Sequence, residues 1–222
     1  MTTDTIQPNE RYSRQQDIVP LDRLAACRAT VVGVGAIGRQ VALQLTAMGI
    51  PWLKLIDFDV VEESNLASQG YLEEDLGRPK VQATGELCHK VNSGLQLQLV
   101  NDRFRRSMEI GNILFSAVDK IDARRLIWDA VKNHVSVYID ARMSAEVVRV
   151  LAAVDEKSRR YYPTTLFAAG EAYAGPCTAK SIIYTANIAA GLALGQFTRY
   201  LRGLPIDQDV SVNILTSELT VA

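Results

Sequence analysis

The sequence predicts an α/β fold, a doubly wound and mostly parallel sheet with helices on both faces. Two observations point to this class. Segments with strand-like and helix-like patterns alternate over about the first 140 residues, which is the rhythm of a parallel sheet. A glycine-rich turn, GVGAIG at 33–38, joins the first strand-like segment to the first helix-like segment, as in a Rossmann-like unit. Because the alternation stops further along, we expect added antiparallel strands in the C-terminal third.

Strands are predicted where apolar runs rich in β-branched residues are bounded by turn residues. They occupy residues 28–35, 52–59, 95–100, 112–119, 135–141, 146–155 and 210–217. The run at 112–119 is apolar almost throughout, so we expect a central strand buried on both faces. The run at 95–100 alternates between apolar and polar residues, so one of its faces is expected to be exposed.

Helices are predicted where apolar residues recur at helical spacing. They occupy residues 37–48, a segment from about Pro79 to just before Gly94, residues 123–131 and residues 179–202. The last of these is apolar almost all round, so we expect it to be buried. We expect a loop between 59 and 79, and an irregular stretch at 156–177. A long loop of this kind in a compact domain is usually functional.

The chain has 222 residues, enough for one domain with a sizeable core. We expect a single domain over 1–222, built from an N-terminal helical segment at 1–27, a nucleotide-binding core at 28–155, the loop at 156–177, and a closing helix and strand at 178–222. The 24 basic and 25 acidic residues nearly cancel, which gives no electrostatic reason to bind nucleic acid or a membrane. The N-terminus lacks the apolar segment of a signal peptide, so we expect a soluble, cytoplasmic protein.

Cysteines and histidines are too few and too scattered to predict a disulfide framework or a zinc site. Cys27, Cys88 and Cys177 form no C-x-x-C pair, so we expect no zinc. We expect Cys27 and Cys88 to be structural, and His89 and His134 to lie on helix surfaces.

The glycine-rich turn predicts a nucleotide site. Gly33 permits a tight turn, Gly35 lets the backbone approach a diphosphate, and Gly38 lets the helix pack closely on the strand. The N–H groups at the start of the following helix would face the anion. Asp57 ends the next strand, where a carboxylate can bind a ribose hydroxyl. The same parts would serve NAD or ATP, and the glycines do not decide between them.

Further motifs resemble those of one superfamily. RYSRQ at 11–15, GVGAIG, DFD with SNL and Gln69, GRPK, and SAVDK at 116–120 occur in its order and spacing. The chain is similar over roughly 11–203 to the ubiquitin-activating-enzyme superfamily, also called the ThiF/MoeB/HesA adenylyltransferases, and looks like a compact, prokaryotic-type member. The resemblance implies ATP-dependent adenylation of the C-terminal glycine of a ubiquitin-like or sulfur-carrier protein, with ATP and Mg²⁺ as cofactors and no zinc.

The resemblance also implies roles for individual residues. Asp57 would hold the ribose, Lys80 would contact the phosphates, and Asp119 would ligate Mg²⁺. Asn65 would lie near the triphosphate, and its neighbours Ser64 and Leu66, together with Lys120, are expected in the same nucleotide site. Simpler interpretations exist: a solvated first-turn lysine at Lys80, a helix cap at Asp119, a turn residue at Asp57.

Arg14 matches an arginine that, in this superfamily, reaches into the partner's site, which implies a homodimer. A plain surface charge is the simpler interpretation. One position departs from the family pattern, because Ser68 stands where an arginine commonly precedes the glutamine. Arg14 of a partner or Arg78 would have to supply that cation, and adenylation would otherwise be slow.

Cys177 lies in AGPCTAKS, just before the last predicted helix, and resembles the catalytic-cysteine segment of ubiquitin-activating enzymes. A helix N-terminus lowers the pKa of a thiol, which favours the nucleophilic thiolate. We therefore expect Cys177 to attack the acyl-adenylate and form a thioester; a small buried residue is the alternative.

Several functions remain open at this stage. The missing zinc pairs and the PCT segment favour a ubiquitin-like conjugation system, with a conjugating enzyme as a further partner. The alternatives are a sulfur-carrier adenylyltransferase for thiamine or molybdopterin synthesis, a non-catalytic partner subunit, an adenylating enzyme for a small molecule or a tRNA base, and an NAD-dependent oxidoreductase. The last lacks a hydride-transfer acid or base such as Tyr-x-x-x-Lys.

Overall fold

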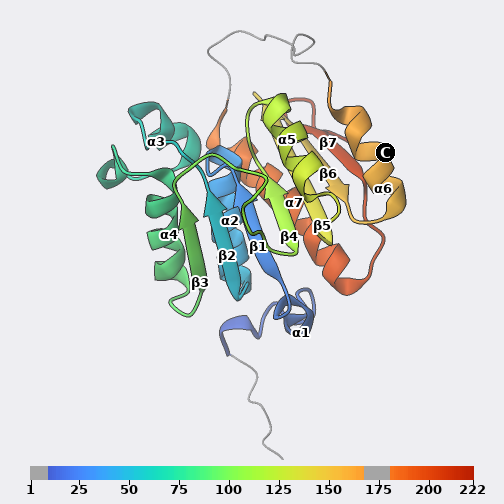
Figure 1. The fold of residues 1–222 in the computed structure, drawn as a ribbon, viewed down its shortest axis with the longest axis horizontal. Coiled ribbons are helices and arrows are strands. Elements are labelled where there is room, and N and C mark those ends of the chain that lie inside the picture. Colours follow the sequence, from blue (N-terminus) through green and yellow to red (C-terminus); the bar gives the residue numbers. More distant parts are fainter. Residues whose placement is uncertain (1–9, 168–180) are drawn as a thin grey trace, which may run out of the picture.

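The computed structural model of the chain describes residues 10–167 and 181–222. An eight-stranded sheet crosses this part of the molecule in the order β3-β2-β1-β4-β5-β6-β7-β8 (Figure 1). The strands are β1 (Arg28–Val32), β2 (Trp52–Ile56), β3 (Gln96–Val100), β4 (Ile113–Ser116), β5 (Val137–Ser144), β6 (Val147–Ala153), β7 (Asp209–Asn213) and β8 (Glu218–Val221). The first five run parallel and β6, β7 and β8 are antiparallel, which confirms the predicted class.

Helices cover both faces of the sheet. They are α1 (Leu21–Leu24), α2 (Ala36–Met48), α3 (Glu63–Gln69), α4 (Lys80–Val91), α5 (Ile121–Val131), α6 (Glu156–Tyr161) and α7 (Ile183–Arg202), with short 3-10 helices η1 (Glu10–Tyr12), η2 (Glu73–Asp75) and η3 (Tyr162–Thr165). Helices α2, α4 and α7 pack on one face, and α5, α6 and η3 pack on the other. Figure 1 shows α5 in front of the sheet and α2 and α7 behind it.

Two predicted loops contain helices. Helix α3 lies within the expected loop between 59 and 79, where Asn65 accepts the backbone N–H of Glu62 and caps the first turn. Helices α6 and η3 lie within the expected irregular stretch, where Asp155 accepts the backbone N–H of Ser158 as an N-cap. In both places a local side-chain cap, rather than apolar periodicity, begins the helix.

The C-terminal part also differs from its prediction. Of the expected strand at 210–217, only the part up to Asn213 is a strand, β7; a turn follows, and β8 begins at Glu218 and pairs with β7. Helix α7 begins at Ile183, and residues 179–180 of the predicted helix lie outside the described residues. It is not buried all round, because Tyr184 and Ile188 are exposed. The predicted division of 1–222 into segments stays a prediction.

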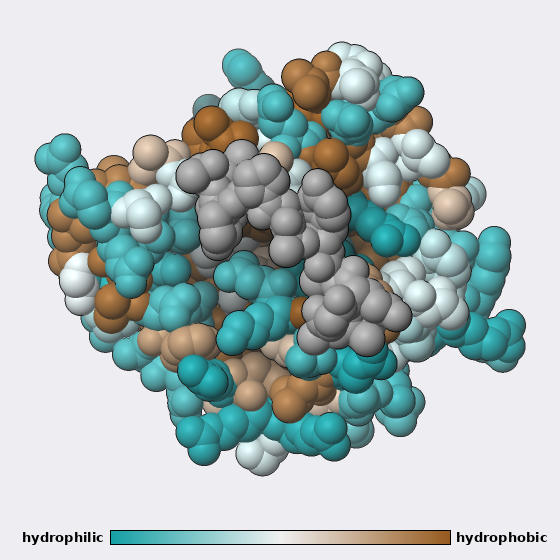
Figure 2. All heavy atoms as spheres, turned by 90° about the horizontal axis from the view of Figure 1, so that it is seen from above, coloured by the Kyte–Doolittle hydropathy of each residue, from teal (hydrophilic) through white to brown (hydrophobic). Residues whose placement is uncertain are grey.

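The parallel strands place their carboxyl ends at one edge of the sheet. From β1 the chain proceeds to β2 on one side, whereas β4 lies on the other side of β1. Such a switch in strand order opens a crevice at the carboxyl edge, where ligands of α/β proteins bind. The glycine loop follows β1, and the SAVDK segment follows β4. Figure 2 looks down on the molecule from this side, and most of the described surface in view is hydrophilic.

Candidate nucleotide site

The presence of a glycine has a different structural explanation at each of the three loop positions. Gly33 has φ +87°, and an added Cβ would lie 2.7 Å from the carbonyl oxygen of Ala117, so the loops after β1 and β4 touch. A Cβ on Gly38 would lie 1.8 Å from the carbonyl oxygen of Gly33. Around Gly35, however, the nearest atom to an added Cβ is Oε1 of Gln69 at 3.7 Å. Protein packing thus explains the first and third glycines, whereas a Cβ at Gly35 would make only one ordinary contact, so packing does not require a glycine there.

Gln69 supplies a second sign of a ligand beside Gly35. Its Oε1 is buried and has no hydrogen-bond donor within the described residues. Leaving a buried acceptor unpaired costs about 1–3 kcal/mol, so such atoms call for an explanation. A bound ligand with a hydroxyl or amino group would satisfy this oxygen.

Asp57 joins the end of β2 to the glycine loop. Its Oδ2 accepts the backbone N–H of Val34 at 2.5 Å, and its Oδ1 accepts the backbone N–H of Asp59 at 2.8 Å. Burial raises the pKa of the Asp57 carboxyl, against the opposing effect of these two donors. The bond to Asp59 is that of a strand-end turn, and the bond to Val34 places the carboxylate against the predicted phosphate loop. Asp57 therefore both closes a turn at the end of β2 and contacts the glycine loop.

Lys80 lies beside the same loop. It is the first residue of α4 and is buried, so the solvated interpretation is wrong. Its backbone N–H donates to the carbonyl of Asp59 at 2.9 Å, and its ammonium lies 3.4 Å from Oδ2 of Asp59. The GRPK and DFD segments are thus held together, and one cation is fixed beside Asp57.

Asp119 lies in the loop after β4 and is exposed, as is Lys120. Lys120 is the N-cap residue of α5, so the interpretation of Asp119 as a helix cap is wrong. Mg²⁺ in nucleotide sites is bound by one or two carboxylates together with substrate phosphates. An exposed carboxylate next to the glycine loop fits that requirement. Within the described ranges, no cluster of three or more His, Cys, Asp or Glu side chains could hold a metal by itself.

Helix α3 holds the SNL residues. Asn65 is buried, and its Oδ1 caps the helix while its Nδ2 donates to Oγ of Ser64 at 3.3 Å. Ser68 donates to the carbonyl of Ser64 at 2.8 Å. Leu66 is half-buried in the same helix. The polar atoms of Asn65 are therefore engaged within α3, and a role near a triphosphate would require them to exchange partners.

Arg78, which was expected as one replacement for the arginine missing at Ser68, is engaged in ion pairs. Its guanidinium pairs with Asp75 at 3.2 Å and with Glu86. Hydrogen bonding to Glu86 raises the pKa of Arg78 further. These partners hold Arg78 between η2 and the outer side of α4.

Arg14 is far from the other site residues of its own chain. Its neighbour Gln15 donates to the carbonyl of Met48, and Tyr12 lies against Gly49, both at the C-terminal end of α2. Since α2 begins at the carboxyl edge of the sheet, its far end lies at the opposite edge, where Figure 1 also shows α1. Cys177, the remaining predicted site residue, lies outside the described residues.

A polar support under the glycine loop was missed by sequence reasoning. The hydroxyl of Tyr71 donates to the carbonyl of Val34 at 2.6 Å and lies 3.2 Å from Oγ1 of Thr84. The buried guanidinium of Arg39 lies over the Tyr71 ring and donates to the carbonyl of Gly70. The available signal was Tyr71 in SQGY, directly after the recognised SNL and Gln69 motif.

Cys27, Cys88 and His89 agree with their predicted positions, whereas His134 does not. Cys27 and Cys88 are buried, and burial raises the pKa of each thiol, that of Cys27 to about 11. His89 is exposed on α4, and His134 is exposed in the turn that follows α5, not on a helix surface. No helix within the described ranges combines the length and hydropathy that a bilayer-spanning segment requires.

Comparison with known proteins places the whole arrangement in one family. The model of the ThiF family matches residues 12–218. The chain is 34% identical over 139 residues to "Adenylyltransferase and sulfurtransferase MOCS3" of Dictyostelium discoideum, covering 57% of this chain and 33% of that protein. It is 31% identical over 133 residues to "Sulfur carrier protein ThiS adenylyltransferase" of Bacillus subtilis, covering 54% and 40%. The matches thus span less than half the length of these relatives.

Solved structures show the same fold. A crystal structure of PaaA has a TM-score of 0.78 at 19% identity, covering 100% of this chain and 85% of that one. Escherichia coli MccB with ATP has a TM-score of 0.76 at 18% identity, covering 97% and 72%.

Proposed function

Because the chain belongs to the ThiF family, we propose that it binds Mg·ATP at the carboxyl edge of the sheet and adenylates the C-terminal glycine of a ubiquitin-like sulfur-carrier protein. One observation carries the choice of site: the unpaired acceptor of Gln69 lies beside Gly35, a loop position where packing does not require a glycine. A bound nucleotide would account for both the glycine and the unpaired oxygen.

Each nucleotide part meets a matching group. The N-terminus of α2 presents backbone N–H groups and the positive end of the helix dipole to the phosphates. Asp57, already fixed against the loop, accepts from a ribose hydroxyl. Lys80, the first residue of α4, contributes a positive charge whose position the helix fixes. Asp119 would hold Mg²⁺, which when bound neutralises phosphate charge.

In the reaction, the carrier carboxylate attacks the α-phosphorus of ATP. A new bond joins the carboxylate oxygen to this phosphorus, the bond to the β-phosphate oxygen breaks, and pyrophosphate leaves with the electron pair. Negative charge moves toward the leaving group as this happens. A fixed ammonium at Lys80 stabilises that charge without having to reorganise, which is how electrostatic preorganisation lowers a barrier.

A sulfur carrier fits the relatives better than a conjugation system. Two similar proteins carry sulfurtransferase or sulfur carrier in their names, so the predicted bias toward ubiquitin-like conjugation finds no support. We keep a thioester at Cys177 as part of the proposal, formed when the thiolate attacks the acyl-adenylate and releases AMP. No group among the described residues bears on that step.

We also propose that the active form is a homodimer. Arg14 lies at the edge opposite its own nucleotide site, so only a second copy could bring it to one. The support is this position, together with an apolar strip on β8, where Leu219 is 62% and Val221 49% exposed. A strip of this kind suits a protein partner.

Mixing two inactive variants tests the dimer. Arg14→Ala and Asp119→Ala are each expected to be inactive alone. After random subunit exchange, about a quarter of all sites would combine an intact Asp119 with an intact Arg14. Recovery of about that fraction of activity supports a trans arginine, and no recovery despite verified exchange contradicts it.

The experiment for the adenylation step is ATP–pyrophosphate exchange with a purified sulfur-carrier protein that ends in glycine. The same carrier without its last residue serves as the control. We expect exchange with the intact carrier alone, and loss of exchange in Asp119→Ala. Exchange that persists in Asp119→Ala would remove this residue from the mechanism, and equal exchange with the shortened carrier would contradict the substrate.

A further inference from the structure

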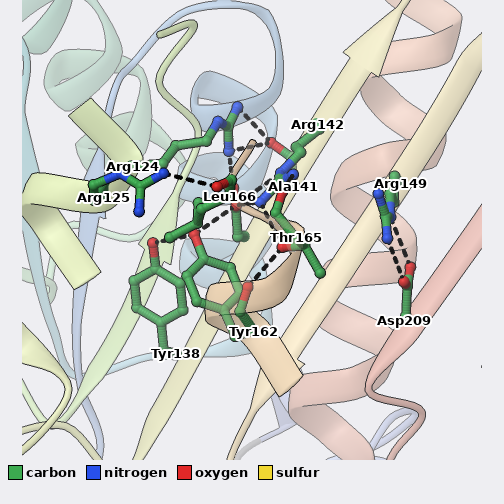
Figure 3. Close-up of polar contacts among 11 residues, drawn as sticks. Arg124, Arg125, Tyr138, Ala141, Arg142, Arg149, Tyr162, Thr165, Leu166 and Asp209 are labelled. Atoms are coloured by element: carbon green, nitrogen blue, oxygen red, sulfur yellow. Dashed lines mark hydrogen bonds and ion pairs between the residues drawn. The ribbon is translucent and has the colours of Figure 1, made fainter. Parts of the chain in front are cut away.

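A buried cluster of charged side chains lies at the carboxyl edge beyond the nucleotide residues, and no motif used above includes it. Asp140 on β5 is fully buried. It pairs with Arg124 of α5 through Oδ1, and Oδ2 accepts from Nε of Arg142 at 2.9 Å and from the hydroxyl of Tyr162 at 2.8 Å. Figure 3 shows Arg124, Arg142 and Tyr162 converging from three elements. The hydroxyl of Tyr138 lies 3.0 Å from that of Tyr162.

The cluster is energetically costly to bury. It holds two guanidinium groups for one carboxylate, and the Arg124 and Arg142 side chains are only 7% and 14% exposed. Burying charge is expensive, and apolar side chains of similar size often stabilise a core equally well or better. Stability is therefore a weak reason for it. The arrangement fixes directions, because each arginine is a planar fork with several donors.

The guanidinium groups of Arg142 and Arg125 bind one backbone segment. Arg142 donates to the carbonyl of Thr165 at 3.0 Å and to its hydroxyl at 3.1 Å. The neighbouring Arg125, in the first half of α5, donates to the carbonyl of Leu166 at 2.7 Å. Residues 162–166 are thus fixed against β5 and α5 by charge-assisted bonds from two directions.

This segment lies beside the nucleotide site. Asp140 is paired in register with Ser116 of β4, and Ser116 with Val32, the residue before Gly33. At roughly 4.8 Å between strands, Asp140 lies about 10 Å across the sheet from the end of β1. The nucleotide residues occupy the edge over β2, β1 and β4. The edge over β5 remains for the second substrate.

We propose that Arg142, oriented by Asp140, is a positioning residue that fixes residues 162–166 as a wall for the acyl substrate, here the C-terminal tail of the carrier. This rests on the proposed function. The nucleotide does not depend on this wall, so its loss weakens use of the carrier and spares use of ATP. Arg125 completes the wall from α5, and Arg124 holds Asp140 and the carbonyl of Ala141 in place.

The chain offers a matched control. Arg149 forms a two-pronged pair with Asp209 at 3.0 and 2.6 Å, and Tyr161 donates to the same carboxylate at 2.7 Å. It has the same chemistry as the Asp140 cluster and lies on the next strands, with Arg149 of β6 directly opposite Arg142 of β5 in register (Figure 3). It has no hydrogen bond to Thr165 or Leu166 among the described contacts.

The first test is amide hydrogen exchange of peptides spanning 162–167 in the free protein. Arg142→Ala is expected to speed exchange there about tenfold or more, and Arg149→Ala less than about twofold. Asp140→Asn, which keeps the shape, should act like Arg142→Ala. Unchanged exchange in both cluster variants would overturn the proposal.

The second test separates positioning from a structural role. In ATP–pyrophosphate exchange with the carrier ending in glycine, Arg142→Ala should raise the KM for carrier about tenfold and that for ATP less than about twofold. Arg142→Lys should not rescue, because an ammonium lacks the fork. Equal changes in both KM values, or rescue by lysine, would overturn the proposal. If the unchanged protein supports no exchange at all, the proposed function fails, and the carrier role of Arg142 is overturned with it.

Discussion

The two halves of the carboxyl edge are built differently. Over β1 and β2, the candidate site consists of backbone, one buried carboxylate and one lysine, and it includes the unpaired acceptor of Gln69. Over β5, Asp140 is paired with two arginines and a tyrosine hydroxyl, and Arg142 also binds the backbone of Thr165. The first half is arranged to receive a ligand, whereas the second is arranged to hold part of the chain in place.

The two halves also differ in how their charged side chains are paired. The Lys80 ammonium is 3.4 Å from an exposed carboxylate of Asp59, a loose pair that phosphate oxygens could replace. In the Asp140 cluster, burial and the charge of Arg142 lower the pKa of Arg124 to about 10, yet both arginines remain charged at neutral pH. Such a cluster does not release its partners for a ligand.

Removing the Asp140 carboxylate should have the largest effect on the free energy of unfolding. Asp140→Ala leaves two buried guanidinium groups without a counter-charge, which costs about 3–5 kcal/mol of unfolding free energy. Asp209→Ala, whose partner Arg149 is 37% exposed, should cost about 1–2 kcal/mol. Urea unfolding measures both. Equal losses would show that the two pairs do not differ as described.

The glycine loop gives the next largest effect, and it separates packing from binding. Gly38→Ala drives a Cβ into the carbonyl of Gly33 and should cost about 3 kcal/mol. Gly35→Ala adds a Cβ that makes only an ordinary contact with Gln69, so it should change stability by less than about 0.5 kcal/mol while abolishing stabilisation by Mg·ATP. Thermal unfolding with and without ligand checks both. Retained ATP binding in Gly35→Ala would move the phosphate away from this loop.

Lys80 tests the electrostatic part of the proposal. Lys80→Ala should lower the rate of ATP–pyrophosphate exchange by about 10²–10³-fold, a range seen when one transition-state donor is lost. Lys90→Ala, an exposed lysine near the other end of α4, is the matched control and should leave the rate unchanged. A small loss in Lys80→Ala, equal to that of the control, would contradict the role.

The smallest expected effect is a difference in reactivity among the three thiols. With a pKa of about 11, Cys27 is about a thousandth ionised at pH 8, and both Cys27 and Cys88 are buried. We expect iodoacetamide to label Cys177 in the native protein and all three cysteines in urea. Mass spectrometry assigns the sites. Labelling of Cys27 as fast as Cys177 would contradict the predicted difference.

Much of the first half was predictable because its signals are local. The run before Gly33 and the helical spacing after it define β1, the turn and α2, and Asp57 follows the next strand. Helix α3 escaped prediction because its reason is the bond between Glu62 and Asn65, not an apolar stripe. The engagement of Asn65 within that helix was equally invisible.

The second half was not predictable as a site, because its parts come from α5, β5 and η3. A signal did exist. Asp140 and Arg142 lie two residues apart in an otherwise apolar strand, so they share one face of it. Charges on a strand face that must be buried require partners. Sequence alone does not say that the partners are Arg124, Tyr162 and the backbone of Thr165.

The most direct test of the central claim is thermal unfolding of the purified protein with Mg·ATP, with NAD and with neither. Ligand at about 100 times its Kd stabilises the folded state by about 2.7 kcal/mol. For a chain of this size, that is a rise in Tm of about 5–11 °C. We predict this rise with Mg·ATP and none with NAD. A rise with NAD alone would contradict the adenylating function and leave the fold unchanged.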